Sequence, residues 1–238
     1  MERLDKVLSN AGVGSRKEVK VMVKKGLVKV DSMKVKDSGL QVDPEKAVIE
    51  VEGKIIGYRK YTYLLMNKPA GVVSATFDNY DRTVIDLLKD KHRIFEPFPV
   101  GRLDKDTVGL LLITNDGDMN HRLISPKWHV DKVYYAEIDK PVTEEDVQRF
   151  KEGVVLDDGY KCMSAKLEIL AVDENGSKVN VTIQEGKFHQ VKRMFKSVGK
   201  EVVYLKRISF GPIKLDDQLP EGEYRELSNE EIGLLRGI

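Results

Sequence analysis

The 238-residue sequence predicts an α+β fold made of two domains. About 50 N-terminal residues read as a compact helix-helix-strand unit, and the remainder mixes strand-like and helix-like runs that do not alternate strictly. No Gly-x-Gly-x-x-Gly loop opens a predicted helix. A mixed, mainly antiparallel sheet with flanking helices is therefore favoured over a Rossmann-type parallel sheet. We place the domains at residues 1–58 and 59–238.

The N-terminal domain is expected to begin with two short helices. Apolar residues at helical spacing predict the first helix over residues 3–11. Ser15 and Glu18 have the spacing of a capping box, which predicts a second helix over residues 16–25. Gly26 then supplies a left-handed C-terminal stop.

Short strands are expected to complete this domain, around residues 28–30, Val35 and residues 48–51. Residues 53–61 are expected to form a linker into the next strand, residues 63–66.

The larger domain contains the mixed pattern. Strand-like runs cover residues 98–100, 109–114, 132–138, 164–171, 178–184 and 202–209. Helix-like runs cover residues 83–89, 117–124, 143–152, 189–198 and 228–235.

Charge is distributed unevenly along a chain whose net charge is +1. Residues 1–60 carry 14 lysines and arginines against 9 aspartates and glutamates, so the remainder is net negative. Arg16, Lys20 and Lys24 recur every four residues and would form a basic stripe on one helix face. This asymmetry indicates a basic module that meets a polyanion.

Several classes of protein lack support in the sequence. The apolar runs are too short to span a bilayer, and the N-terminus lacks the apolar region of a signal peptide. The single cysteine, Cys162, cannot form an internal disulfide, which fits a reducing cytoplasm. Metal-ligand spacings, a Walker A loop and a Gly-x-Ser-x-Gly motif are absent. We therefore expect a cytoplasmic protein without metal or cofactor, and a monomer because no heptads are present.

The strongest candidate for chemistry is the charged, glycine-bounded loop of residues 101–109, which leads into an apolar strand. Arg102 and Lys105 flank Asp104, and nearby cations keep a carboxylate ionised at neutral pH. An ionised carboxylate can attack carbon or remove a proton. The residues alone leave a surface turn with ion pairs as the alternative.

Four segments then carry a resemblance to a known family. Residues 101–111 (GRLDKDTVGLL), followed by residues 114–117 (TNDG), resemble the signature of RsuA-like pseudouridine synthases. Residues 66–71 (MNKPAG), 132–134 (KVY) and 185–195 (EGKFHQVKRMF) agree in order and spacing. The N-terminal domain resembles an S4-like (αL) RNA-binding domain, which commonly precedes this catalytic domain.

The resemblance implies a role for individual residues. Asp104 would be the catalytic aspartate, Lys192 would pair with it, and Tyr134 would stack on a flipped uracil. Arg102 would fill the space that the target nucleotide leaves. Phosphates would be held by the S4-like stripe of Arg16, Lys20 and Lys24. Further substrate or RNA contacts are expected from Asn67, Lys68, Lys132, His189 and Gln190, of which the last two would brace their loop rather than act in catalysis.

The implied function is the conversion of a specific uridine of ribosomal RNA to pseudouridine, a reaction that needs no cofactor. Residues 121–127 (HRLISPK) resemble the branch that acts on uridine 516 of 16S rRNA, either free or in an assembling small subunit. The alternatives are a sister branch that acts on 23S rRNA, a non-catalytic S4-domain assembly factor, and an aspartate-dependent hydrolase of a small substrate.

Overall fold

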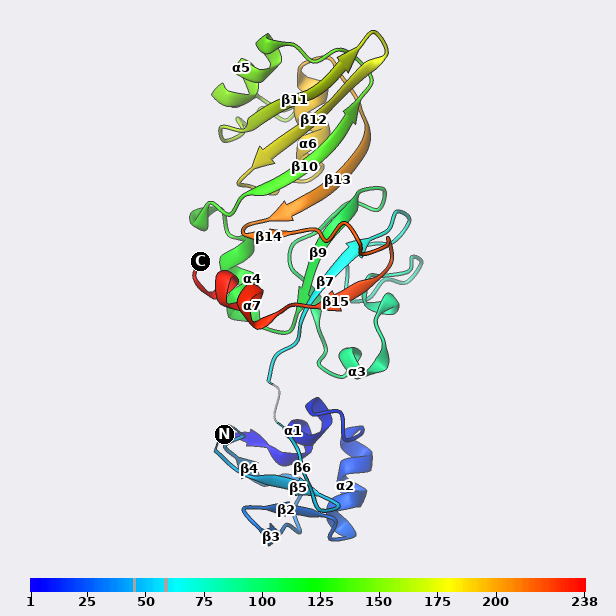
Figure 1. Cartoon of the computed structure of the whole chain (residues 1–238), viewed down its shortest axis with the longest axis vertical. Coiled ribbons are helices and arrows are strands. Elements are labelled where there is room, and N and C mark those ends of the chain that lie inside the picture. The colour runs from blue at the N-terminus through cyan, green and yellow to red at the C-terminus, as the bar shows by residue number, and fades with distance from the viewer. Residues whose placement is uncertain (45, 58–59) are drawn as a thin grey trace. The chain divides into compact units, whose positions relative to one another are not determined.

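The computed structural model describes residues 1–44, 46–57 and 60–238 (Figure 1). Contacts between residues divide the chain into two compact units, Met1–Thr62 with Lys89–Pro97, and Tyr63–Leu88 with Phe98–Ile238. The boundary expected after residue 58 stays a prediction, because Tyr58 and Arg59 lie outside the described residues. None of the helices in the described ranges combines the length and the apolar character that a membrane span requires.

The first unit combines short helices with short antiparallel strands (Figure 1). Its helices before the linker are α1 (Leu4–Asn10) and α2 (Arg16–Lys24), and a further short helix, α3, spans Asp90–Arg93. β1 (Glu2–Arg3) pairs with β4 (Gln41–Val42). A second sheet has the order β3 (Met33–Lys34), β2 (Val28–Val30), β5 (Ile49–Val51), β6 (Lys54–Ile55).

The start of α2 confirms the predicted capping box. The Ser15 main-chain N–H donates to the Glu18 carboxylate at 2.8 Å, and the Glu18 N–H donates to the Ser15 hydroxyl at 3.3 Å. Gly26 has a φ of +71°, as expected for a residue that ends a helix in the left-handed region. Val19 and Val23 are buried on the inner face of α2.

Strand β6 corrects the expectation that residues 53–61 are entirely a linker. Glu52 and Gly53 both have positive φ, at +52° and +80°, which is the geometry of a tight hairpin turn between β5 and β6. The turn returns Lys54 and Ile55 to pair antiparallel with β5. The linker is therefore shorter than expected.

The second unit is built on one large sheet of order β11-β12-β10-β13-β9-β7-β15. These strands span Lys166–Asp173, Gly176–Ile183, Lys132–Ile138, Val202–Phe210, Val108–Thr114, Tyr63–Lys68 and Tyr224–Glu226, respectively. β8 (Phe98–Pro99) pairs with β9, and β14 (Ile213–Lys214) pairs with β13. β13 and β9 run parallel, whereas the other pairings between the named strands of this sheet are antiparallel. The predicted mixed, mainly antiparallel sheet is confirmed.

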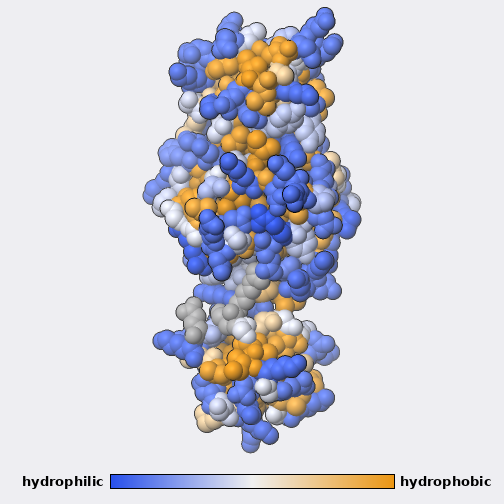
Figure 2. Space-filling view, viewed as in Figure 1, coloured by the Kyte–Doolittle hydropathy of each residue, from blue (hydrophilic) through white to orange (hydrophobic). Residues whose placement is uncertain are grey.

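Helices flank this sheet (Figure 1). They are α4 (Gly117–Ile124), α5 (Glu144–Glu152), α6 (Gln190–Ser197) and α7 (Asn229–Arg236), with short 3-10 turns at Ile85–Leu87 and Pro126–Trp128. α5 contacts β11 and α6 contacts β13. The ring centres of Phe150 in α5 and Phe195 in α6 lie 4.9 Å apart. Figure 2 shows polar side chains interspersed with apolar patches over the visible surface.

The helix expected over residues 83–89 is wrong, since only a 3-10 turn forms there. The Asp86 carboxylate accepts hydrogen bonds from the Thr83 main chain and hydroxyl at 2.8 and 2.9 Å, which closes a local turn. Leu88 is already extended, with a ψ of 147°, so the turn cannot propagate.

Gly109 allows the close approach of the two parallel strands. It has a φ of +101°, and a Cβ at this position would overlap the main-chain oxygen of Arg207. Arg207 of β13 lies opposite Gly109 of β9 in the register. This contact fixes β13 beside the end of the loop that carries Asp104.

Candidate active site

The loop between β8 and β9 is anchored on both sides of Asp104. The Ser74 hydroxyl donates to the Leu103 carbonyl at 2.9 Å and accepts from the Leu103 N–H at 3.1 Å. The Thr107 N–H donates to the Asp104 carbonyl at 3.1 Å. Because Leu103 is buried, the loop presents the Asp104 carboxylate, which is 26% exposed, from a fixed main chain.

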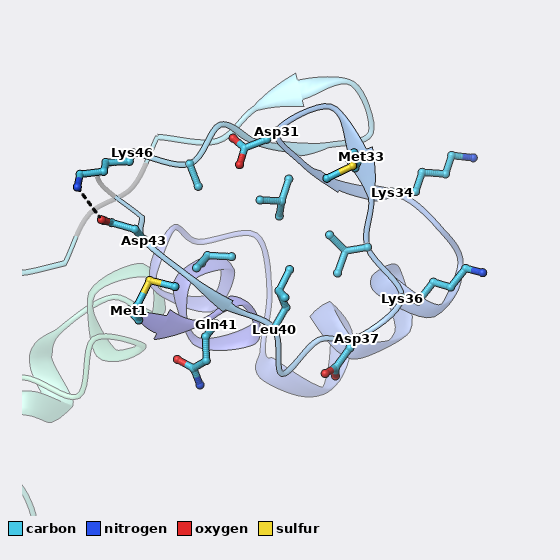
Figure 3. Close-up of a pocket in the computed structure, with 14 residues that line it drawn as sticks. Met1, Asp31, Met33, Lys34, Lys36, Asp37, Leu40, Gln41, Asp43 and Lys46 are labelled. Atoms are coloured by element: carbon cyan, nitrogen blue, oxygen red, sulfur yellow. Dashed lines mark ion pairs between the residues drawn. The ribbon is translucent and has the colours of Figure 1, made fainter.

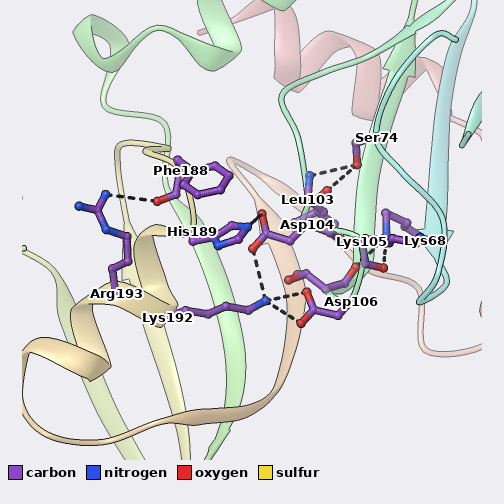
Figure 4. A network of polar contacts seen from close by, with 11 residues as sticks. Lys68, Ser74, Leu103, Asp104, Lys105, Asp106, Phe188, His189, Lys192 and Arg193 are labelled. Carbon is purple, nitrogen blue, oxygen red and sulfur yellow. Dashed lines mark hydrogen bonds and ion pairs between the residues drawn. The ribbon is translucent and has the colours of Figure 1, made fainter. Parts of the chain in front are cut away.

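Lys68 braces the same loop through its side chain (Figure 4). Its fully buried ammonium donates to the carbonyls of Thr107 at 2.9 Å, Pro69 at 3.0 Å and Asp104 at 3.1 Å. Burial lowers the pKa of Lys68 to about 8, although the carboxylates of Asp106 and Asp104 oppose this shift. The expectation that Lys68 contacts RNA is corrected, because its side chain is enclosed and braces the loop.

Two side chains, Lys192 and His189, lie beside the Asp104 carboxylate (Figure 4). The Lys192 ammonium lies 3.5 Å from Asp104 Oδ2, and His189 Nε2 lies 3.5 Å from Asp104 Oδ1. Lys192 is closer still to Asp106, at 2.6 and 2.8 Å from its two oxygens. The hydrogen bond from Lys192 holds the pKa of Asp106 below its usual range, against the opposing effect of burial.

This arrangement differs in two details from the one expected. Asp106 was not among the predicted site residues, although it lies two positions from Asp104. Lys105 turns away from Asp104 and forms an ion pair with Asp81 at 2.6 Å. The cation nearest the Asp104 carboxylate therefore comes from α6 rather than from the flanking loop residue.

A cavity of about 290 Å³ opens in front of Asp104. Ligand pockets begin at about this size. Its lining includes Arg102, Asp104, Tyr134, His189, Arg207 and Phe210. These residues come from the Asp104 loop, from β10, from the start of α6 and from β13, so the fold joins segments that lie far apart in the sequence.

Tyr134 forms one wall of the cavity. It lies on β10 opposite Arg207 of β13, and its side chain is buried apart from 7% of its surface. The Arg207 guanidinium donates to the Tyr134 hydroxyl at 3.4 Å and lies 5.9 Å from the ring centre. An aromatic ring held in this way can stack on a planar base that enters the cavity.

The His189 side chain also lines the cavity. Its ring stacks on that of Phe188 at 3.8 Å, and His189 itself takes a left-handed conformation with a φ of +49° where α6 begins. This conformation aims the imidazole at Asp104. Arg102, which also lines the cavity, is exposed.

Arg207 is a site residue that sequence reasoning missed. It is 2% exposed and shares the inward face of β13 with Leu205. Arg207 occupies a position on the strand where an apolar residue is expected, and this is the signal that could have identified it. Burying a guanidinium costs folding free energy, so a buried arginine indicates a functional position. Lys132, at the start of β10, is similarly buried, and burial lowers its pKa to about 8, with Arg207 adding to the effect.

The expected RNA contact of Asn67 is corrected, and Gln190 also lies inside the protein. The Asn67 amide is buried and donates to the Leu219 carbonyl at 2.8 Å. Gln190 is buried, donates to the Glu185 carboxylate at 2.7 Å and accepts from the Lys187 N–H at 2.9 Å. The Asn67 Oδ1 has no hydrogen-bond partner among the described residues, whereas Gln190 is bonded on both sides of its amide and braces the loop before α6.

Residues 114–117 also have a structural task. The Asp116 carboxylate accepts from the Met119 N–H at 3.1 Å, which caps α4, and from the Tyr63 hydroxyl at 2.7 Å. Burial and this carboxylate raise the pKa of Tyr63 to about 12. The motif thus fixes the start of the helix whose last residue, Ile124, lines the cavity.

The first unit contains the predicted basic stripe and a separate cavity. Arg16, Lys20 and Lys24 are all exposed on α2. A groove of about 710 Å³ is lined by apolar residues such as Met33 and Leu40 together with charged ones such as Lys34 and Asp37 (Figure 3). Its rim bears opposite charges, including an Asp43–Lys46 ion pair at 3.7 Å.

The thiol of Cys162 and the metal-ligating side chains do not form a second site in the described residues. Cys162 is buried, and burial raises the pKa of its thiol to about 11, which keeps it protonated and unreactive. No group of three or more metal-ligating side chains occurs among residues 1–44, 46–57 and 60–238.

Comparison with known proteins identifies the same two parts of the chain. A family model described as RNA pseudouridylate synthase matches residues 62–197, and one described as S4 domain matches residues 2–48. A crystal structure of a pseudouridylate synthase superimposes with a TM-score of 0.68 at 35% identity, covering 99% of this chain and 100% of that one.

Curated relatives match over nearly their whole length. The chain is 52% identical to the uncharacterized RNA pseudouridine synthase YtzG of Bacillus subtilis, over 98% of both proteins. It is 39% identical to ribosomal large subunit pseudouridine synthase B of the same organism, over 100% of this chain and 97% of that one. It is 40% identical to ribosomal small subunit pseudouridine synthase A of Vibrio cholerae, over 97% of both. The resemblance carried by the four motifs and the N-terminal domain is confirmed.

Proposed function

The chain belongs to the RNA pseudouridylate synthase family, and from this premise we propose that it isomerises uridine 516 of 16S rRNA, with Asp104 as the catalytic carboxylate. We further propose that it acts as a monomer in the cytoplasm. The observation that carries the proposal is the position of Asp104, which faces the cavity together with Tyr134 while Lys192 and His189 lie 3.5 Å from its two oxygens.

The chemistry requires a base that has left its helix. Extraction of a nucleotide costs a few kcal/mol, and stacking on Tyr134 returns about 1–3 kcal/mol. Arg102 is exposed at the cavity, where it can occupy the space that the base vacates. The N1–C1′ bond then breaks, the uracil turns, and a C5–C1′ bond forms while C5 loses a proton and N1 gains one.

Lys192 and His189 assist by keeping the Asp104 carboxylate oriented. Each touches a different oxygen of the carboxylate, so the side chain cannot rotate freely. When bound RNA excludes water from the cavity, these charge-assisted contacts strengthen. The aspartate then meets the sugar or the base as a fixed anion.

The first unit supplies affinity. Arg16, Lys20 and Lys24 lie on the exposed face of α2, where they can neutralise phosphates without reading bases. RNA is therefore gripped by one unit and modified by the other.

The choice of target rests on residues 121–127. This segment includes the end of α4 and Ile124, whose side chain lines the cavity beside Gly101. Relatives named for the small and for the large ribosomal subunit are almost equally similar, at 40% and 39% identity. A 23S rRNA target is therefore the second candidate, and the segment beside the cavity favours the 16S target.

Carbodiimide-based mapping of pseudouridine in rRNA tests the proposal. Cells that lack the protein should lose one signal, at uridine 516 of 16S rRNA, and a plasmid copy should restore it. Loss of a 23S signal instead would assign the enzyme to the sister branch. Unchanged signals throughout, with a defect in subunit assembly, would point to a non-catalytic assembly factor.

A further inference from the structure

Two cations are enclosed beside the candidate active site. Arg207 is 2% exposed and Lys132 is 5% exposed, and both line the cavity in front of Asp104. They extend from neighbouring strands, β13 and β10, and both lie over the ring of Phe210. The distances to the ring centre are 5.0 Å for Arg207 Cζ and 5.2 Å for Lys132 Nζ. Two positive charges therefore lie in the lining of this cavity.

Neither cation has a carboxylate within ion-pair distance in the part of the chain that the structure describes. Arg207 donates to the Leu110 carbonyl at 2.8 Å and to the Tyr134 hydroxyl at 3.4 Å, and its buried Nη2 has no hydrogen-bond acceptor among these residues. Lys132 donates to the carbonyls of Val130 at 2.8 Å and Gln184 at 3.5 Å. The nearby Asp131 carboxylate is engaged by Gln184 at 2.9 Å.

Such an arrangement is costly for the folded protein. A buried charge loses its hydration, and an arginine cannot relieve this cost by releasing its proton. Neutral carbonyls and ring faces compensate in part only. Enclosed, unneutralised cations that line a cavity are therefore arranged for an anion that forms in the cavity.

We propose that Arg207, supported by Lys132, stabilises the negative charge that develops on the uracil ring when its bond to ribose breaks. The proposal rests on the function proposed above. When the N1–C1′ bond breaks, its electron pair passes to uracil, which becomes an anion delocalised over N1 and the two carbonyl oxygens. The charge disappears again when C5 bonds to C1′, C5 loses its proton and N1 gains one.

The position of Arg207 favours the base rather than a phosphate. Its guanidinium contacts the hydroxyl of Tyr134, so its charge lies at the edge of the ring on which the base would stack. A planar anion stacked on Tyr134 would lie with its polar edge near this charge. Arg102, which is exposed at the cavity, is better placed for the phosphate backbone.

A substrate with a better leaving group tests the proposal. RNA is prepared with uridine or with 5-fluorouridine at the target position, because fluorine withdraws electrons and makes the uracil anion more stable. Single-turnover rates of loss of the original nucleoside are measured for the wild type, Arg207→Met, Arg207→Lys and Lys132→Met. Lys206→Met serves as the control, because its side chain leaves β13 on the opposite face from Arg207.

We expect Arg207→Met to slow the uridine reaction by about 10²-fold or more, as when an electrostatic donor is removed from other active sites. The loss should be at least about tenfold smaller with 5-fluorouridine, and Arg207→Lys should lose less than Arg207→Met on both RNAs. Lys132→Met, which leaves β13 untouched, should show the same dependence on the base, while Lys206→Met should leave both rates unchanged.

Equal losses on the two RNAs for both Arg207→Met and Lys132→Met would overturn the proposal, since a purely structural role affects both bases alike. Weaker RNA binding with an unchanged rate ratio would assign the cations to a phosphate and overturn it too. If Arg207→Met does not fold, Lys132→Met and Arg207→Lys decide the question. A wild-type protein that converts neither RNA would refute the proposed function itself, which is a separate outcome.

Discussion

The ammonium of Lys68 donates a hydrogen bond to the main-chain carbonyl of Asp104 at 3.1 Å. The lysine belongs to β7 and is fully buried, whereas the side chain of Asp104, on the loop between β8 and β9, faces the cavity. A charged group inside the protein thus positions the candidate catalytic residue through its backbone. Mutation of this lysine should therefore affect both stability and activity.

Lys68→Met should lower the free energy of unfolding by about 1–3 kcal/mol, because buried carbonyls lose their donor. It should also lower kcat, since the loop that carries Asp104 loses the hydrogen bonds from Lys68. Urea unfolding and single-turnover assays measure the two effects. Lys178→Met, on an exposed position of β12, is the control and should be neutral. Wild-type stability and activity in Lys68→Met would contradict this account of the loop.

The same variant should change the pH dependence of stability. The pKa of Lys68 is lowered from 10.5 to about 8 in the folded protein. Between these values the unfolded chain binds more protons, so the contribution of Lys68 to stability rises with pH. The wild type should therefore gain stability relative to Lys68→Met as the pH is raised from about 7 to about 10. A constant difference between the two proteins would refute the lowered pKa.

Lys192 should be replaceable by arginine but not by methionine. Its ammonium contacts both Asp104 and Asp106, so Lys192→Met leaves two neighbouring carboxylates without a shared cation. We expect activity to fall by about 10²-fold, the scale of losing one electrostatic contact in an active site. Lys192→Arg keeps the charge and should retain most activity. Asp106→Asn is the matched control, because it removes the closer partner and leaves the contact with Asp104. If Asp106→Asn were as damaging as Lys192→Met, the pairing with Asp104 would not be the important one.

Gly109→Ala should destabilise the protein although it adds only a methyl group. The position has a φ of +101°, and the new Cβ would overlap the Arg207 main-chain oxygen. The cost should be at least about 1–3 kcal/mol, as for other strained backbone positions. Gly117→Ala, at the first residue of α4, has no atom within 4 Å of its added Cβ and should be neutral or stabilising. Thermal unfolding compares the two variants, and similar midpoints would contradict the close approach of β9 and β13.

The basic stripe on α2 should act as a phosphate clamp. Lys20→Glu with Lys24→Glu should weaken RNA binding, and each lost phosphate contact should reduce the slope of log affinity against log salt by about 0.7–0.9. Lys34→Glu with Lys36→Glu makes the same charge change on another exposed surface of the unit. Fluorescence anisotropy over a range of salt concentrations measures the slopes. An unchanged slope in the first pair, or equal changes in both, would remove the clamp.

Local patterns predicted much of the fold. The strand at residues 132–138 and the helix at 117–124 form where expected, because their periodicity and caps are encoded within a few residues. The hairpin at Glu52-Gly53 was missed, although its turn is local and consists of two adjacent residues with positive φ. The turn at residues 85–87 was mistaken for part of a helix, because the Thr83–Asp86 contacts compete with helical hydrogen bonds.

The site was less accessible to sequence reasoning, because its side chains meet through strand pairing. Lys68 and Asn67 stand in a recognisable motif, yet β7 lies between β9 and β15, and this placement buries both. Arg207 faces Tyr134 only because β13 pairs with β10 in one particular register. The preference of Lys192 for Asp106 depends on how α6 sits over the loop, which no local pattern encodes.

The most direct test of the whole account is the amount of pseudouridine that Asp104→Asn forms in an rRNA fragment, measured beside its affinity for that RNA. The substitution keeps the size of the side chain and removes its charge. We predict wild-type affinity with no detectable pseudouridine. Pseudouridine formed by Asp104→Asn at the wild-type rate would contradict the claim that this carboxylate performs the reaction.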